Sequence, residues 1–289
     1  MDKVVVGGAT ATSAAIELAT ALTPNFDRDV AMSGIMGVGF SIINNGISSP
    51  PLLLLPIHPT NPLPLTVQPI QQKTTFDDLI PSLARPVISA DLREDGSGSY
   101  HFGSIPSDAY IGSEADLTSL PVFPGDGYWE FISPFYSING TIRYNLRTNC
   151  SATAPCTGGN TAIADTGTSL LIVDPGVAAD YYSNIPGAQD NKATYGGWVF
   201  PSNLSASELP SFGVSMGDTI VTVPTGLMCY SYADNAEQYC YGAVQDNIAG
   251  NGQSLGVQIY GDVMFRSAFV VFVNDTVNPS LLIGEKAHY

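Results

Sequence analysis

The sequence predicts an all-β fold with many turns. It contains 29 Gly and 21 Pro among 289 residues, and both residue types interrupt helices and favour turns. Short apolar stretches rich in Val, Ile, Thr and Tyr lie between these turn residues, as is typical of strands. A chain of this length can bury a large core in one large domain or two modest ones.

The composition is acidic, with 26 Asp and Glu against 10 Lys and Arg and a net charge of −16. This charge argues against nucleic acid or an anionic membrane as a partner, because both would repel the protein. No apolar run approaches the ~18 residues of a transmembrane helix. The acidic surface suits a protein that stays soluble at low pH, although it also fits ordinary solubility.

Two short helices are expected within this β-rich chain. Phe76, Leu79, Ile80 and Leu83 recur at helical spacing, with Thr74 or Thr75 as the cap and Pro86 as the stop. A second helix is expected at residues 175–184, because Pro175 suits a first turn and apolar residues follow at helical spacing.

One stretch, residues 162–172, reads as a buried strand, a tight turn and a second strand. The turn carries the carboxylate of Asp165. Gly167 allows the backbone to turn without a Cβ clash, and the hydroxyls of Thr166 and Thr168 can orient the carboxylate. Taken alone, Asp-Thr-Gly is more often an ordinary turn between strands.

The wider context favours a catalytic turn. The segment Asp165-Thr166-Gly167-Thr168-Ser169-Leu170-Leu171 resembles the second catalytic turn of the pepsin-like aspartic proteases, and other matching segments follow the family's order over nearly the whole chain. These segments are residues 34–40, 100–105, 127–131, 181–182, 209–212, 223–224, 259–265 and 270–272. The chain most resembles the secreted fungal members of this family.

The resemblance implies an all-β, bilobal pepsin-like fold with a truncated N-terminal lobe. Residues 1–124 resemble the second half of the N-terminal lobe, and residues 125–289 resemble a complete C-terminal catalytic lobe. The chain contains no further Asp-Thr-Gly or Asp-Ser-Gly. We therefore expect the first catalytic Asp of the family to lie upstream of Met1.

In this family, two carboxyl groups share one proton, because two negative charges at so short a distance would repel each other too strongly for both groups to be ionised. One activates a water and the other polarises the scissile carbonyl, without a metal or cofactor. The resemblance makes Asp165 one of the pair; the carboxylate of Asp262 matches a structural residue of the family. The expected substrate-binding residues, of which the last three could equally be core, are Gly167, Thr168, Thr166, Tyr128, Ile163 and Ile259. Thr168 is expected to bond the outer oxygen of Asp165, and Thr166 to brace two catalytic loops.

Residues 46–69 are a Pro-rich insertion relative to the family. Pro at this density blocks helix and interior strand alike. One hypothesis is an exposed polyproline-like loop that binds a partner. The other, which we favour, is an unspliced intron read as protein, because its removal restores a join that is usual in the family.

The four Cys residues form two close pairs, Cys150/Cys156 and Cys229/Cys240, and two local disulfides are plausible. Zinc is unlikely, because no His lies near either pair in the sequence. The first pair matches a small disulfide loop of the family. In the second, Cys229 is expected to replace a partner usually found near position 202, where this chain has Ser202.

Four glycosylation sequons occur, at Asn139, Asn149, Asn203 and Asn274. With the paired Cys residues they favour a secreted protein, with the vacuole as the alternative destination. The N-terminus lacks the basic start and continuous apolar segment of a signal peptide.

Three hypotheses follow for function. The first is an acid-optimum aspartic endopeptidase that acts on polypeptides, of which this chain is an incomplete form. The second is an inactive homologue that binds peptides or a partner. The third, a homodimer that joins two Asp165 turns, is disfavoured, and we expect a monomer. By itself the 289-residue chain is expected to have absent or very weak activity, because it supplies one catalytic carboxylate.

Overall fold

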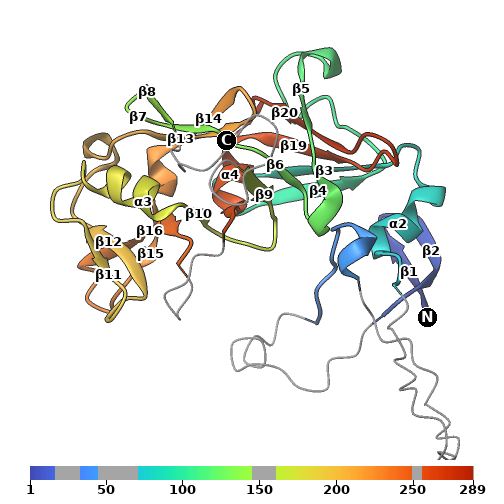
Figure 1. The fold of residues 1–289 in the computed structure, drawn as a ribbon, viewed down its shortest axis with the longest axis horizontal. Helices are drawn as coiled ribbons and strands as arrows, with labels where there is room; N and C mark the ends of the chain where they lie inside the picture. The colour runs from blue at the N-terminus through green and yellow to red at the C-terminus, as the bar shows by residue number, and fades with distance from the viewer. Residues whose placement is uncertain (17–32, 45–70, 145–160, 249–255, 289) are drawn as a thin grey trace, which may run out of the picture. The chain divides into compact units, whose positions relative to one another are not determined.

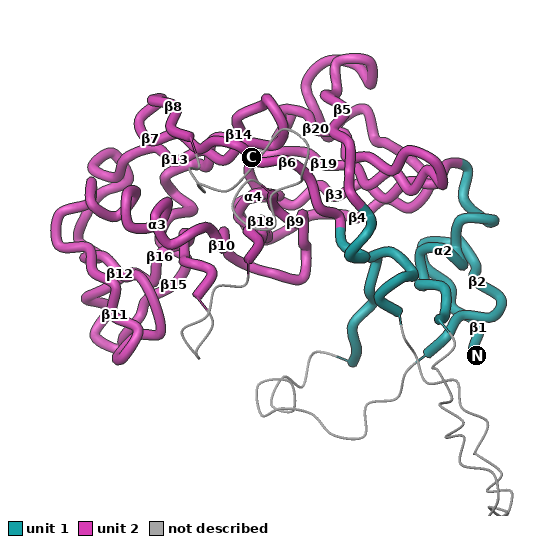
Figure 2. The backbone as a smooth tube through the Cα atoms, in the orientation of Figure 1, with its two compact units in different colours: residues 1–84, 124–128 teal, residues 85–123, 129–289 magenta. Residues whose placement is uncertain are grey.

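The computed structural model describes residues 1–16, 33–44, 71–144, 161–248 and 256–288, and these residues are mainly β-strands (Figure 1). The all-β prediction is therefore confirmed. The chain divides into two compact units, which Figure 2 colours separately. Unit 1 comprises residues 1–84 and 124–128, and unit 2 comprises residues 85–123 and 129–289. The truncation of the first lobe and the lobe boundary at residue 124 stay predictions.

Unit 1 contains a β-hairpin formed by β1 (Asp2–Val6) and β2 (Ala9–Ala14). Gly7 and Gly8 form its two-residue turn with φ of 54° and 91°, as the twist of a tight hairpin requires. Among its described residues, the short helical segments of this unit are η1 (Ser41–Ile43), α2 (Thr75–Leu79), η2 (Ile80–Ser82) and η4 (Pro124–Asp126).

Helix α2 begins where the sequence predicts it. Thr74 caps it, since the Thr74 hydroxyl accepts the Asp77 N–H at 3.3 Å and the Asp77 carboxylate accepts the Thr74 N–H at 3.3 Å. The helix buries Phe76 and Leu79, and it packs against β2. It is shorter than expected: the chain continues as the 3₁₀ segment η2, which contains Pro81, a residue that cannot donate a helical hydrogen bond.

Unit 2 contains a five-stranded antiparallel sheet with the order β4-β3-β19-β20-β5. Its strands are β3 (Val87–Leu92), β4 (Gly98–Phe102), β5 (Thr118–Pro121), β19 (Phe269–Val273) and β20 (Ser280–Gly284). Residues from the middle of the chain thus pair with the last strands. The 3₁₀ turn η3 (Glu114–Asp116) precedes β5.

A second five-stranded sheet, with the order β17-β10-β18-β9-β6, surrounds the Asp165 turn. Its strands are β6 (Glu130–Ile132), β9 (Thr161–Ala164), β10 (Leu171–Val173), β17 (Val244–Asp246) and β18 (Gln258–Tyr260). Strand β18 pairs parallel with β9 and antiparallel with β10. It therefore lies between the two strands that carry the turn.

Two four-stranded sheets complete the described strands of unit 2, in the orders β14-β13-β7-β8 and β11-β12-β16-β15. The first comprises β7 (Phe135–Ile138), β8 (Thr141–Tyr144), β13 (Phe212–Met216) and β14 (Thr219–Val223). The second comprises β11 (Gln189–Asn191), β12 (Gly197–Pro201), β15 (Cys229–Tyr232) and β16 (Tyr239–Gly242). The remaining helical segments that the structure describes are α3 (Pro175–Tyr182), η5 (Ala206–Glu208), η6 (Thr225–Leu227) and α4 (Asp262–Ser267).

Helix α3 confirms the second predicted helix and ends two residues earlier than expected. Pro175 occupies its first turn, and the helix buries Tyr181 and Tyr182. The Tyr182 ring stacks on Trp198 of β12 with ring centres 4.8 Å apart. These aromatic contacts join the helix to the β11-β12-β16-β15 sheet.

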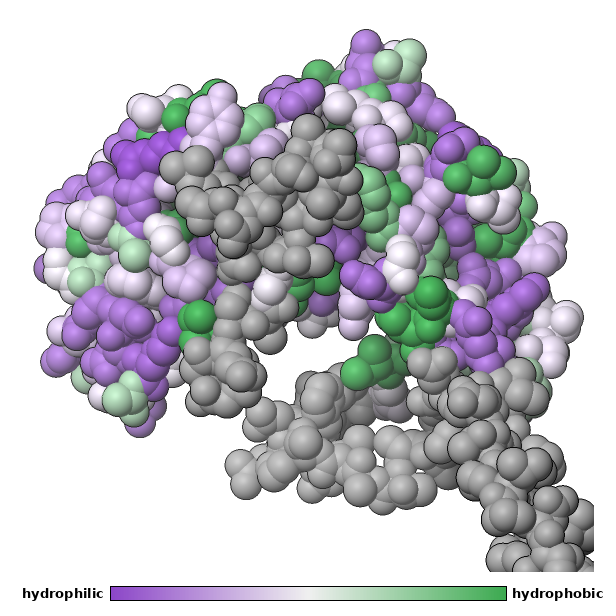
Figure 3. Space-filling view, viewed as in Figure 1, coloured by the Kyte–Doolittle hydropathy of each residue, from purple (hydrophilic) through white to green (hydrophobic). Residues whose placement is uncertain are grey.

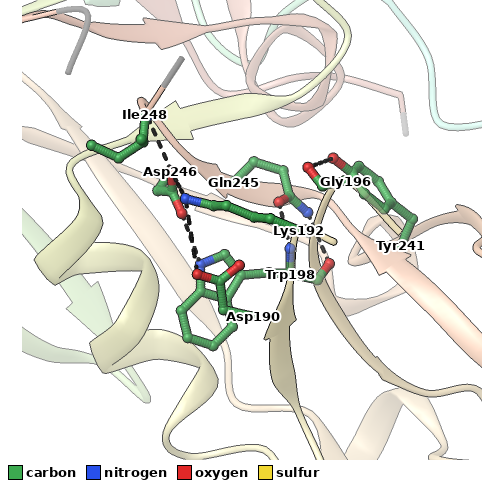
Figure 4. A network of polar contacts seen from close by, with 8 residues as sticks. All are labelled: Asp190, Lys192, Gly196, Trp198, Tyr241, Gln245, Asp246 and Ile248. Atoms are coloured by element: carbon green, nitrogen blue, oxygen red, sulfur yellow. Dashed lines mark hydrogen bonds and ion pairs between the residues drawn. The ribbon is translucent and has the colours of Figure 1, made fainter. Parts of the chain in front are cut away.

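Strand β17 is tied to the β11–β12 hairpin by polar contacts (Figure 4). Lys192 Nζ lies 2.8 Å from Asp246 Oδ1, and the Trp198 indole N–H donates to Asp246 Oδ2 at 3.2 Å. The Gln245 amide bonds the Trp198 backbone N–H and carbonyl at 2.8 and 2.9 Å. The outer surface over this hairpin is hydrophilic (Figure 3).

The structure confirms the Cys229–Cys240 disulfide, which joins the neighbouring strands β15 and β16. Cys150, Cys156 and Asn149 lie outside the described residues, as do residues 46–69. Asn139 and Asn203 are exposed, whereas Asn274 is only 8% exposed, and its backbone N–H donates to the Pro86 carbonyl at 2.8 Å.

A buried ion pair joins the C-terminal segment to β3. Lys286 is 0% exposed, and its amine lies 2.7 Å from Asp91 Oδ1. We expect Lys286→Met to lower the free energy of unfolding by about 3–5 kcal/mol, because it leaves the Asp91 carboxylate buried without this partner. Denaturant unfolding measures the effect.

The exposed ion pair Arg85–Glu114 provides the control, and Arg85→Met should cost less than about 1 kcal/mol. The double variant Asp91→Leu/Lys286→Met should recover most of the loss, since it removes both charges. A loss for Lys286→Met no larger than that for Arg85→Met would contradict this account.

The exposure of the sequons yields a second prediction. An oligosaccharide attached to Asn is bulky and needs solvent around it. Made in a secretory host, the protein should therefore carry glycan at Asn203 and much less at Asn274. Glycopeptide mass spectrometry measures the occupancy of each sequon. The Asn203→Gln variant is the control, because it removes that sequon and should lose its glycan. Equal or higher occupancy at Asn274 would show that the folded exposure does not decide modification.

Candidate active site

The Asp165 turn follows β9, whose four residues are all buried. The backbone N–H of Asp165 donates to the Tyr260 carbonyl of β18 at 3.1 Å, and the Thr168 N–H donates back to the Asp165 carbonyl at 3.2 Å. The Tyr260 hydroxyl is itself anchored 2.5 Å from Ser133 Oγ. The turn is thus continuous with the interior of the sheet.

Two donors from the turn itself orient the Asp165 carboxylate. The Gly167 N–H donates to Oδ1 at 2.8 Å, and the Thr168 hydroxyl donates to Oδ2 at 2.7 Å. Asp165 is half-buried, whereas Gly167 is exposed. A Cβ at position 167 would lie 3.1 Å from Oδ1, so a larger residue would crowd the carboxylate.

The segment after β18 clamps the other side of the turn. The N–H groups of Gly261, Asp262 and Val263 donate to the carbonyls of Leu170, Thr168 and Ser169 at 3.0, 2.7 and 3.2 Å respectively. A Cβ at position 261 would lie 2.1 Å from the Thr168 carbonyl oxygen. Sequence analysis included Gly261 in the matching segment 259–265 but gave it no role of its own. Its signal is a glycine placed directly after a buried strand.

Asp262 lies close enough to the turn to influence its electrostatics. Burial raises the pKa of its carboxyl, the nearby charge of Arg266 opposes this, and the charge of Asp165 adds to the increase. The Asp262 N–H bonds Thr168 in the clamp. The position of Asp262 at the start of α4 therefore agrees with a structural role, in which it helps to hold the Asp165 turn in place.

Tyr100 of β4 is a neighbour of the turn that sequence reasoning missed. Burial is the largest cause that raises the pKa of Tyr100; its polar interaction with the Thr166 side chain lowers this pKa, and the charges of Asp262 and Asp165 raise it. Residues so distant in the sequence give no local pattern that could predict this proximity.

The expected apolar contact residues lie in different settings. Ile163 and Ile259 are paired neighbours on β9 and β18; Ile163 is only 9% exposed and Ile259 is half-buried. Ile163 thus belongs to the core beneath the turn. Tyr128 belongs to unit 1, where it is 46% exposed. The substrate contacts of all three residues stay predictions.

The described part of the chain contains no group of three or more His, Cys, Asp or Glu side chains arranged to hold a metal ion. Among the same residues, no helix is long and apolar enough to cross a membrane.

Comparison with known proteins supports the resemblance. A family model described as eukaryotic aspartyl protease matches residues 1–282. Penicillopepsin-1 of Talaromyces stipitatus is 35% identical over 96% of this chain and 59% of its own length. Aspergillopepsin-1 of Aspergillus oryzae is 35% identical over 99% of this chain and 60% of its own length.

Aspartic protease pepA of Leptosphaeria maculans is 34% identical over 93% of this chain and 55% of its own length. The chain thus spans less than two thirds of the length of each of these curated relatives. Because the family model covers nearly the whole sequence, the chain belongs to the eukaryotic aspartyl protease family, with fungal pepsin-like enzymes among its relatives.

Proposed function

We propose that Asp165 supplies one of the two carboxylates of an aspartic endopeptidase centre that acts on polypeptides. The observation that carries this proposal is the orientation of its carboxylate by Gly167 and Thr168, within a turn that Gly261 clamps. A catalytic group needs such support, since small misplacements of a reacting group are costly.

The chemistry requires an ionised and a protonated carboxyl group. The ionised group takes a proton from water as its oxygen attacks the peptide carbonyl carbon, while the protonated group donates to the carbonyl oxygen. Collapse of the intermediate breaks the C–N bond, and the amine leaves with a proton. Each Asp165 oxygen accepts one bond within the turn and retains acceptor capacity for a water.

The second carboxylate needs a separate source. The sequence contains one Asp-Thr-Gly, and we assign Asp262 no catalytic role, because its backbone and half-buried side chain belong to the clamp of the turn. We infer that the 289-residue chain contributes half of a catalytic pair. The proposal also includes the location of the protein, which is either secreted or vacuolar.

The first test is cleavage of an unfolded protein by the purified chain at about pH 3–4, where a coupled pair would hold one proton. We expect absent or very weak cleavage, because a single carboxyl group cannot both activate the water and donate a proton to the peptide carbonyl oxygen. Pepstatin-sensitive turnover that Asp165→Ala abolishes would contradict this expectation and would show that the chain, alone or as a dimer, completes the pair.

Binding of pepstatin tests the role of Asp165 without turnover. We expect Asp165→Asn to weaken binding and the exposed Asp218→Asn control to leave it unchanged, because only Asp165 is presented by the clamped turn. Equal binding by the wild type and the Asp165→Asn variant would refute the assignment. Peptide binding that is independent of Asp165 would favour the alternative, an inactive peptide- or partner-binding protein.

The raised pKa of Asp262 predicts how the stability depends on pH. The folded state holds this proton more tightly than the unfolded state does, so the stabilising contribution is full below the ordinary aspartate value of 3.8 and is lost as pH rises through the folded-state pKa. Relative to Asp262→Asn, the wild type should therefore be most stable at low pH and lose that advantage toward neutral pH.

Urea unfolding of both proteins at several pH values between about 3 and 7 measures this difference. Asp218→Asn, measured in parallel, controls for the loss of a carboxylate on the surface. An advantage of the wild type that grows toward neutral pH would show that the charged form of Asp262 is favoured in the folded state, contrary to this account.

A further inference from the structure

One peptide unit of β18 bridges the two ends of the Asp165 turn. The Tyr260 carbonyl accepts the Asp165 N–H at 3.1 Å. The Gly261 N–H, which belongs to the same peptide unit, donates to the Leu170 carbonyl at 3.0 Å. Because a peptide unit is planar, its C=O and N–H tilt together. Any tilt of this unit would therefore disturb the entry to the turn and the exit from it at once.

The side chain of Tyr260 anchors this peptide unit in the protein interior. Tyr260 is 1% exposed, and its hydroxyl lies 2.5 Å from Ser133 Oγ. The side-chain amide of Gln258 donates to the phenol oxygen over a longer distance of 3.4 Å, which leaves the phenol hydrogen for Ser133. The Phe131 ring meets the Tyr260 ring edge-on, with ring centres 5.8 Å apart. Polar contacts and ring packing thus hold the same side chain.

The chain of hydroxyl groups continues into a second sheet. Ser133 Oγ lies 3.2 Å from Ser215 Oγ, which accepts the Phe135 N–H at 3.1 Å. Ser133 directly follows β6, which belongs to the sheet of the Asp165 turn, whereas Ser215 lies on β13 and Phe135 begins β7. Both serines are buried, and a buried hydroxyl that loses its partner costs free energy. The phenol of Tyr260 is thereby tied to two sheets.

The alternation of side chains along β18 places this anchor away from the reacting atoms. Neighbouring side chains of a strand point to opposite faces. Gln258 and Tyr260 therefore share one buried face of the strand, and the half-buried Ile259 points to the other. The phenol is thus placed to support the turn from the interior and not to contact a substrate.

We propose that Tyr260 is a positioning residue for the Asp165 carboxylate and acts on it through the backbone of the turn. This inference rests on the proposed role of Asp165. The bond between the phenol and Ser133 fixes the tilt of the peptide unit that receives the Asp165 N–H. Small displacements of a catalytic group slow a reaction strongly, so a buried hydroxyl behind the turn influences the chemistry without touching it.

The test uses the full 289-residue chain with Tyr260→Phe and Ser133→Ala, alone and together. NMR follows three signals of Asp165: the exchange of its amide hydrogen with solvent, the scalar coupling from its amide nitrogen to the Tyr260 carbonyl carbon, and its side-chain carboxyl resonance. Each single variant should accelerate exchange about two- to tenfold, reduce the coupling and shift the resonance. The double variant should add nothing, because both substitutions remove the same bond.

Tyr182→Phe is the matched control. Tyr182 is 2% exposed, and its hydroxyl donates to the Val244 carbonyl at 2.7 Å, so this variant also loses a buried phenol hydrogen bond. It should lower the unfolding midpoint and leave the three Asp165 signals unchanged. Equal acceleration of exchange in Tyr182→Phe and Tyr260→Phe would show that exchange follows general stability, and it would overturn the proposal.

Two other results would also overturn it: additive effects in the double variant, or Asp165 signals that Tyr260→Phe leaves unchanged. Ser133→Ala keeps the Tyr260 ring in place, and it decides the test by itself if Tyr260→Phe does not fold.

Failure of this inference is distinguishable from failure of the proposed function, because the NMR signals need no catalysis and no second carboxylate. Tyr260→Phe that loosens the turn, together with pepstatin binding that Asp165→Asn leaves unchanged, would retain Tyr260 as the anchor of the turn and exclude a catalytic role of Asp165. The opposite pair of results would retain Asp165 and exclude Tyr260.

Discussion

The site depends on the close approach of Gly261 to the turn that follows Asp165. A side chain at this position would collide with the Thr168 carbonyl oxygen, 2.1 Å from the position of a Cβ, so the three hydrogen bonds of the clamp require glycine. Because the clamp fixes the carbonyls of residues 168–170, the Thr168 hydroxyl and Gly167 N–H remain aimed at the carboxylate. The hydrogen bonds within the turn and the passage of β18 between β9 and β10 thus together fix the orientation of the Asp165 carboxylate.

This arrangement explains how a half-exposed acidic group can be held in one orientation. Its strand β9 is buried, its flanking strand β10 is paired with β17 and β18, and β17 is tied to the β11–β12 hairpin by the Asp246 and Gln245 contacts. Tyr100, on β4 of another sheet, lies close enough to Asp165 for its charge to raise the pKa of the phenol. Such rigidity holds the Asp165 carboxylate in one orientation, as its proposed catalytic role requires.

The sequence predicted the features that short-range chemistry controls. It identified the Asp165 turn, the Thr74 cap, the start of α3 and the Cys229–Cys240 pair, because each is encoded within a few residues or a short loop. The buried Lys286–Asp91 pair and the proximity of Tyr100 to the Asp165 turn depend on which strands become neighbours. Strand order and register are long-range properties, and no spacing in one sequence specifies them. The same limit explains why Ile163 could be placed near the turn but not assigned to cleft or core.

The most direct measurement is the scalar coupling across the hydrogen bond between the Gly167 amide nitrogen and the Asp165 carboxyl carbon, in the isotopically labelled protein. The account predicts a measurable coupling together with a single side-chain rotamer of Asp165, because the clamped turn holds both groups in place. The absence of coupling, with an Asp165 side chain that averages among rotamers, would contradict the central claim that this chain presents a preorganised carboxylate.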